Sequence, residues 1–104
     1  MNEALLGQRV GEDKLVKASE LLRTAAHPQR LAILDLLGRH GRLCNLELQE
    51  MLGMEQAILS QHLTLMRDRG LVDYEKDGRF SRYFIRQPEF LRIIGCLEQC
   101  CEKL

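Results

Sequence analysis

The sequence predicts a mainly α-helical domain that contains one small β-hairpin. Two observations carry this expectation: most segments repeat apolar residues three and four positions apart, and two β-rich runs flank one Asp-Gly pair. The chain has 104 residues, and 45% of them are hydrophobic, so one core can form without disulfides or structural metals. We therefore expect residues 1–104 to fold as a single domain.

The charges and cysteines limit the classes of partner. Fifteen Lys and Arg balance 15 Asp and Glu, so any binding to nucleic acid has to come from local positive charge. Four cysteines are too few for a disulfide scaffold, which favours a reducing, cytoplasmic setting. The first residues lack the basic and long apolar regions of an export signal, and no stretch has the length and apolarity of a membrane span. We expect no membrane partner.

Three helices are expected in the first half of the chain. Residues 13–25 place apolar side chains along one stripe of a helix. A His-Pro pair ends this helix and opens a second one over residues 28–37, for which the glycine-flanked segment 38–41 is the expected terminating turn. A shorter helix follows at residues 45–52, where a glycine stops it.

The second half combines two helices with a hairpin. Residues 55–69 form an amphipathic helix, and the β-rich runs 71–76 and 79–85 form a two-stranded ribbon around the Asp-Gly turn at 77–78. The last helix, residues 88–104, has an apolar face that runs to the end of the chain and requires a covering surface.

This order of helix, short helix, tight turn, helix and hairpin is that of a winged helix-turn-helix. In such a domain the second helix of the turn enters the major groove of DNA, and the hairpin reaches the flanking backbone. The outward positions of helix 55–69 carry neutral hydrogen-bonding groups, which suit base edges. A solvated face of an ordinary three-helix core is the alternative reading. The residues expected to read bases are Gln56, Ser60, Gln61 and Thr64, with His62 as a DNA contact or a cap on the core.

Local charge agrees with DNA binding. Residues 56–86 contain six Lys and Arg against four Asp and Glu. The hairpin of residues 71–85 is the wing of such a domain. Its Lys76, Arg79 and Arg82 are expected to contact DNA phosphates. This excess of positive charge is modest, so tight binding requires two copies of the domain on the duplex or a very close fit between the domain and the DNA. A winged helix used only for protein interactions is the alternative of another class, but it would expose apolar residues on helix 55–69. No catalytic motif is present, so we do not expect an enzyme.

Residues 22–85 resemble the ArsR/SmtB family of bacterial metal- and metalloid-responsive repressors. The distinctive runs are 25–34 in the second helix, 59–63 with Leu-Ser-Gln-His-Leu, and 70–72 with Gly-Leu-Val. The resemblance implies a repressor that binds an operator with an imperfect inverted repeat. The family often has serine where this chain has Ala57, so an apolar contact, for example with a thymine methyl group, is expected there.

The resemblance also implies a homodimer in which the first and last helices, 13–25 and 88–104, pair across a two-fold axis. The apolar stripes of both helices independently require such a cover. A ligand that moved the two recognition helices apart would then weaken operator binding. The expected interface residues are Leu15, Leu22, Phe90, Ile94, Leu97 and Cys101.

The family resemblance leaves the effector open. Cys44 matches the first cysteine of the family's thiol site, but Leu46 stands in place of the second, and the last helix lacks the family's zinc ligands. Cys96, Cys100 and Cys101 remain. Cys101 lies in the apolar stripe and is expected to pack as a small hydrophobe. Together with Cys101, or with Cys44 of either subunit, the other two thiols could hold trivalent arsenic, antimony or another soft ion as inducer.

Two alternatives to a metalloid inducer remain. The same thiols could respond to oxidation or persulfide formation, although the family's persulfide sensors carry a cysteine where this chain has Asp35. They could also be tolerated thiols without a sensing role. The sequence does not distinguish these uses.

Overall fold

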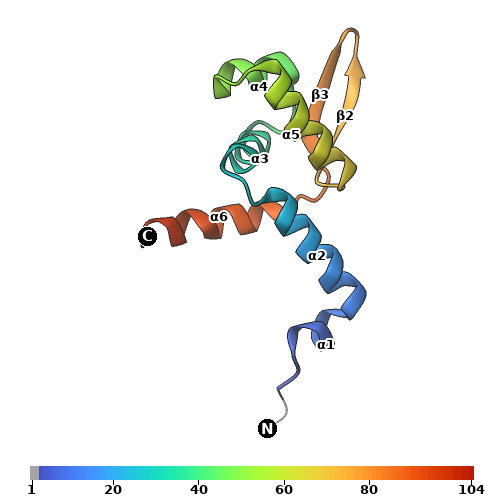
Figure 1. The fold of residues 1–104 in the computed structure, drawn as a ribbon, viewed down its shortest axis with the longest axis vertical. Helices are drawn as coiled ribbons and strands as arrows, with labels where there is room; N and C mark the ends of the chain where they lie inside the picture. Colours follow the sequence, from blue (N-terminus) through green and yellow to red (C-terminus); the bar gives the residue numbers. More distant parts are fainter. Residues whose placement is uncertain (1–2) are drawn as a thin grey trace.

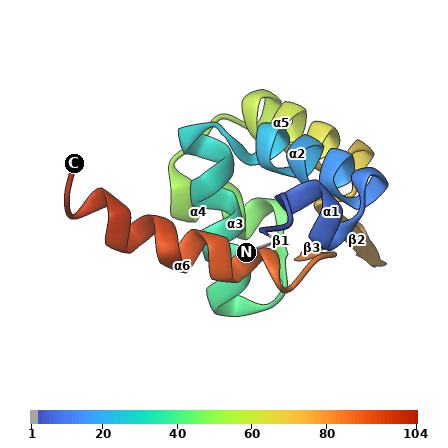
Figure 2. The ribbon, with the colours of Figure 1, turned by 90° about the horizontal axis from the view of Figure 1, so that it is seen from below.

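The structure is a computed structural model that describes residues 3–104, and it consists of a helical body with two projecting arms (Figures 1 and 2). The body contains α3, α4, α5 and the sheet, whereas α2 and α6 leave it in different directions. This shape explains the extents of 57 × 32 × 21 Å. The elements are α1 (Leu6–Val10), α2 (Glu12–Ala25), α3 (Pro28–His40), β1 (Leu43–Cys44), α4 (Asn45–Leu52), α5 (Gln56–Asp68), β2 (Val72–Asp77), β3 (Phe80–Ile85) and α6 (Phe90–Cys101).

The core lies where α3, α4 and α5 meet the base of the wing. Helical spacing of three and four brings one apolar stripe of each helix to the centre. The largest fully buried side chains are Ile33, Leu34, Leu37, Leu48, Leu59, Leu63, Met66, Leu71 and Val72. The arms contribute less to this core, although Ala25 of α2 and Phe90 of α6 are buried against it. The predicted mainly helical fold with a small hairpin is confirmed.

The hairpin differs from the prediction in its turn and in its strand number. Asp77 pairs with Phe80, so the turn is centred on Gly78 and Arg79 rather than on the Asp-Gly pair. Gly78 has φ 63°, and no non-glycine residue in the described chain has positive φ, a combination typical of a type II′ turn. A two-residue strand, β1, joins the other edge of β3 and gives the order β1-β3-β2. Strand β1 is too short to show the alternation of apolar and polar residues from which a strand is predicted.

Two helix boundaries also correct the prediction. Helix α3 continues through His40 and ends at Gly41, because Gly38 remains helical. A Cβ atom at Gly38 would lie 2.5 Å from Leu91 Cδ2, so this glycine permits close packing of α6 on α3. The expected last helix over 88–104 begins at Phe90 and ends at Cys101. No helix in residues 3–104 is long and apolar enough to cross a membrane.

Candidate nucleic-acid interface

The turn between α4 and α5 fixes how the second helix is presented. Gly53 ends α4 in the left-handed conformation with φ 60°, which a residue with a Cβ adopts at a cost. Met54 follows and is buried, so it anchors the turn in the core. Helix α5 then starts at Gln56 and runs beside the wing (Figure 1).

Helix α5 has one buried and one exposed face. Its buried face consists of Leu59, His62, Leu63 and Met66. The side chains expected to read bases, Gln56, Ala57, Ser60, Gln61 and Thr64, are all exposed. Ser60, Gln61 and Thr64 line one shallow hollow of this face. Five of the six DNA-reading positions expected on this helix therefore lie together at the surface.

His62 is the exception and corrects the expectation of a DNA contact. Its side chain is 8% exposed and points into the protein, because position 62 lies on the core stripe of α5. Its Nδ1 accepts a hydrogen bond from Arg30 Nε at 3.1 Å, and its Nε2 lies 2.8 Å from Gln29 Oε1. Burial, followed by the charges of His27 and Arg30, lowers the pKa of His62. His62 therefore links α5 to the start of α3.

The wing presents its basic residues in three different ways. Arg79 lies in the turn at the tip, and Lys76 lies near the end of β2 with its ammonium 5.8 Å from the Tyr74 ring centroid. Arg82 instead forms an ion pair with Asp77 at 3.4 Å and is paired with Glu75 across the strands. Because side chains alternate along a strand, Lys76 and Arg82 lie on opposite faces of the ribbon. DNA therefore has to compete with Asp77 for Arg82, but not for Arg79.

Arg67, which the sequence analysis counted only as a positive charge, holds the wing against α5. Its Nε donates to Asp73 Oδ1 at 3.1 Å, and its guanidinium carbon lies 4.4 Å from the centroid of the Tyr74 ring. The backbone N–H of Tyr74, followed by the Arg67 side chain, lowers the pKa of Asp73 by bonding to its carboxylate. The sequence does contain a signal for this pair: an arginine lies near the end of the helix, and an acidic residue lies at the start of the next strand.

A polar cleft beside the recognition face was also missed. It lies between α4, α5 and β3 and has a volume of about 90 Å³. Asn45 and Gln49 line it from α4, and Ser81 and Tyr83 line it from β3. These groups come from segments far apart in the sequence, so only the folded sheet brings them next to α5.

The residues expected to form a dimer lie mostly on the arms. Leu22, Ile94 and Leu97 line an apolar cavity of about 260 Å³ between α2 and α6. Leu22 and Leu97 are 46% and 37% exposed in the single chain. Leu15 is half-buried. Phe90 corrects the expectation, because at 7% exposure it already belongs to the protomer's own core.

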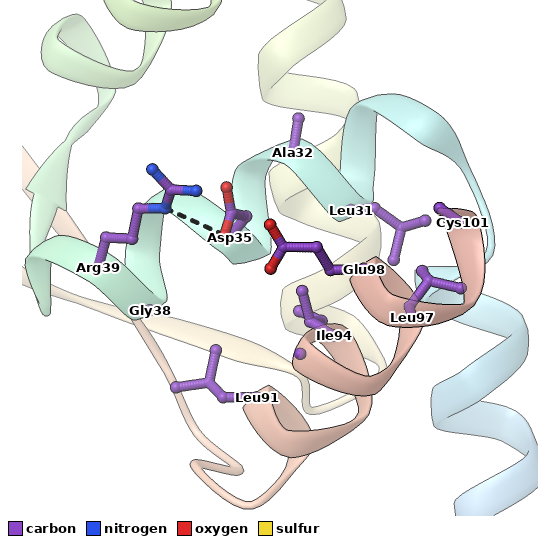
Figure 3. A pocket seen from close by; sticks show the side chains of 11 residues that line it. Leu31, Ala32, Asp35, Gly38, Arg39, Leu91, Ile94, Leu97, Glu98 and Cys101 are labelled. Atoms are coloured by element: carbon purple, nitrogen blue, oxygen red, sulfur yellow. Dashed lines mark hydrogen bonds and ion pairs between the residues drawn. The ribbon is translucent and has the colours of Figure 1, made fainter. Parts of the chain in front are cut away.

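A second groove of about 460 Å³ lies on the other side of α6, where it faces α3 (Figure 3). Asp35 and Arg39 form an ion pair at 3.2 Å on its α3 side, and Glu98 and Cys101 line it from α6. Cys101 was expected to be a small buried hydrophobe, but it is exposed in the single chain. The end of α6 projects beyond the body (Figure 1).

The cysteines do not form a preassembled metal site. Cys96 and Cys100 are exposed on α6, whereas Cys44 is buried at the start of α4. Within residues 3–104, no group of three or more His, Cys, Asp or Glu side chains is placed to hold a metal ion. The expectation that Cys44 of the same chain completes a three-thiol site is therefore wrong. Any three-thiol site has to recruit groups from a second chain or rearrange α6.

A helix-turn-helix with an exposed polar second helix and an adjacent hairpin defines a winged helix-turn-helix protein of the DNA-binding class. A model of the bacterial regulatory protein arsR family matches residues 27–74, which run from the start of α3 into β2. The transcriptional regulator YgaV of Escherichia coli is 35% identical over 82 residues, which cover 79% of this chain and 83% of that protein. The chain belongs to the arsR family and is a DNA-binding transcriptional regulator.

Solved structures agree with this assignment. The structure of the transcriptional repressor PagR of Bacillus anthracis superposes with a TM-score of 0.76 at 34% identity, covering 83% of this chain and 98% of that one. HlyU from Vibrio cholerae gives a TM-score of 0.77 at 34% identity, covering 86% of this chain and 96% of that one. PagR is a transcriptional repressor, and HlyU from Vibrio vulnificus, a further structural neighbour, is a transcriptional regulator. The family to which the chain belongs consists of transcriptional regulators rather than enzymes, as the sequence predicted.

Proposed function

We propose that the protein is a dimeric repressor that reads its operator with the exposed face of α5. The observation that carries this proposal is the division of α5 into a core face and a face of neutral polar side chains beside a basic hairpin. Gln56, Ser60, Gln61 and Thr64 supply donors and acceptors for base edges, and Ala57 supplies an apolar contact. The similarity to the repressor PagR supports repression rather than activation. Such a protein acts in the cytoplasm, where bacterial DNA lies.

Phosphate contacts come from the wing. Arg79 at the tip and Lys76 on the face toward Tyr74 are the first candidates, and Arg82 joins them when it leaves Asp77. These contacts position the domain without reading sequence. Two wings on a two-fold operator double the number of phosphates neutralised, which compensates for the zero net charge of each chain.

The dimer forms through the arms in this proposal. Helices α2 and α6 carry exposed Leu22, Ile93 and Leu97 around an apolar cavity, and apolar surface of this kind is stabilised when a second copy covers it. The two recognition helices then face successive major grooves of an inverted repeat.

The test of DNA binding is a fluorescence titration of the full-length protein on the DNA upstream of its own gene. A scrambled duplex of the same length and base composition is the control. We expect specific binding that weakens as salt is raised, because phosphate contacts release counterions. Equal affinity for both duplexes, or binding that salt leaves unchanged, would contradict the repressor function.

We further propose that the thiols of α6 receive the inducer. Cys96, Cys100 and Cys101 lie within six positions of each other on an arm that the dimer uses, and all three are exposed. Thiolates prefer soft ions, so a trivalent arsenic or antimony compound is the first candidate and reversible thiol oxidation is the second. Since no three metal-ligating side chains lie together within residues 3–104 of one chain, binding has to change the arm or join two chains.

The test follows release of operator DNA while arsenite, antimonite, zinc, cadmium, peroxide or polysulfide is added. Wild type is compared with the double variant Cys96→Ser/Cys100→Ser, and Cys44→Ser is the matched control because its thiol is buried elsewhere. We expect release from wild type and from Cys44→Ser but not from the double variant. If no reagent changes operator affinity by about 1 kcal/mol, the low end of allosteric coupling, the thiols have no sensing role.

A further inference from the structure

A hydrogen-bonded chain runs from the end of α2 through α3 to the buried face of α5. Arg30 Nη1 donates to the carbonyl oxygen of Thr24 at 2.9 Å, and Arg30 Nε donates to His62 Nδ1 at 3.1 Å. On the other side of the ring, His62 Nε2 lies 2.8 Å from Gln29 Oε1. One arginine thus contacts the last turn of the arm and the middle of the recognition helix.

These contacts fix the protonation state of His62. Arginine only donates hydrogen bonds, so Nδ1 has to be the unprotonated nitrogen, and Nε2–H donates to the amide oxygen of Gln29. The neutral imidazole satisfies both partners. A second proton would sit on Nδ1, where it would face the N–H of Arg30 and break that hydrogen bond.

Within residues 3–104, the charges that act on His62 are positive and oppose such a proton. The charged and titratable groups that face His62 are Arg30 and His27, whose ring centroid is 4.8 Å from that of His62. Helix α2 presents only the Thr24 carbonyl to this chain of contacts. Two carboxylates of the neighbouring elements bond to other groups: Glu47 of α4 accepts from the Cys44 N–H, and Asp73 of β2 accepts from Arg67. In residues 3–104, no carboxylate is bonded to Arg30, His27 or His62.

We propose that Arg30 is a positioning residue for DNA recognition: through the neutral ring of His62 it sets the orientation of α5 relative to the end of α2, so operator discrimination falls when His62 gains a proton. The proposal rests on the placement of α5 in the major groove. His62 directly follows Gln61 in α5, and Ser60 and Gln61 point outward while His62 points inward. A shift at the buried ring therefore rotates the face that reads bases.

The first test measures the ratio of operator affinity to scrambled-duplex affinity between about pH 7.5 and about pH 5, a range that spans the ordinary histidine pKa. The ratio removes the general gain in DNA affinity that added positive charge causes. For wild type we expect the ratio to fall about tenfold, the effect of one buried hydrogen bond left unmade. His62→Asn keeps an oxygen acceptor for Arg30 and does not titrate, so its ratio is expected to stay constant.

Two further variants separate positioning from general stability. Arg30→Met is expected to lower the ratio about tenfold already at pH 7.5, with little further change on acidification. Arg39→Met removes the same charge from the exposed side of α3 and His40→Asn removes an exposed histidine, so both should retain the wild-type profile. Thermal unfolding identifies any variant that fails to fold. If the ratio for His62→Asn falls on acidification as much as it does for wild type, the proposal is overturned.

Nitrogen-15 NMR of the full-length wild type tests the same point without a substitution. We expect the proton of the neutral His62 ring on Nε2, and pH-dependent shifts of the α5 backbone amides that His62→Asn abolishes. A proton on Nδ1, or α5 amide shifts that His62→Asn leaves unchanged, would overturn the positioning role. If wild type shows no operator preference at pH 7.5, the proposed function fails, and these amide shifts still decide whether His62 orients α5.

Discussion

Removing the Leu97 side chain beyond Cβ, in Leu97→Ala, should weaken the proposed dimer by a calculable amount. Leu97 is 37% exposed in the single chain. Complete burial of a leucine side chain contributes about 1.5–3 kcal/mol, so covering the exposed part contributes about 0.6–1 kcal/mol. A two-fold dimer contains this residue twice, which gives about 1–2 kcal/mol and raises the dimer Kd about 5- to 30-fold. Leu97→Glu has to desolvate a carboxylate and should leave monomers.

The assay is sedimentation equilibrium of reduced, full-length protein over a range of concentrations. Met51→Ala is the matched control, because Met51 is 50% exposed on α4, away from both arms. We expect the control to have the wild-type dimer Kd. If Leu97→Ala and Met51→Ala have the same dimer Kd, or if Leu97→Glu sediments as a dimer, the arms do not form the interface.

Four other predictions concern the reading face, the wing and acid stability. Gln61→Ala should lower discrimination between operator and scrambled DNA by about 1–3 kcal/mol in duplex titrations. Arg79→Ala should weaken binding to both duplexes and reduce the slope of log affinity against log salt concentration by about one. Arg67→Met should speed amide exchange in β2, because Asp73 loses its partner, and an unchanged exchange rate would contradict this role. Because the pKa of His62 is lowered by folding, the unfolded chain takes up this proton first. The folded state should therefore lose stability as pH falls below about 6.5, with a shallower decline for His62→Asn in thermal unfolding.

The helices of the body were predictable because their apolar stripes are complete. Helix α5 was expected over 55–69 and spans Gln56–Asp68, and its buried residues follow the predicted spacing. The expected end of α3 was wrong because glycine at position 38 usually stops a helix, whereas here it makes room for Leu91 of α6. That contact joins residues more than 50 positions apart, and local patterns carry no information about it. The same reason applies to β1, which exists only through its pairing with β3.

The exposure of the candidate reading face was predictable, but the contacts that support this face from inside the protein were not. Exposed polar residues at helical spacing identified Gln61 and its neighbours from the sequence. His62 lies in the same run and was expected to contact DNA or to cap the core, because the sequence alone does not separate a polar side chain on the core stripe from the polar face. Its buried place depends on Arg30 and Gln29, which are more than 30 positions away. A buried histidine is identified by its partners, and these become visible only in the fold.

In the proposed function, the body reads DNA, and the two arms, α2 and α6, form the dimer. The body holds α5 through a core of side chains that are fully buried within the single chain, so this core does not require a second copy. In the proposed dimer, α2 and α6 set the distance between the two recognition helices, and their buried contacts with the body include Ala25 and Phe90. Under the proposed function, a change at the thiols of α6 alters the spacing of the two recognition helices without unfolding either body. We therefore expect an inducer to lower operator affinity while the thermal unfolding of the body stays unchanged.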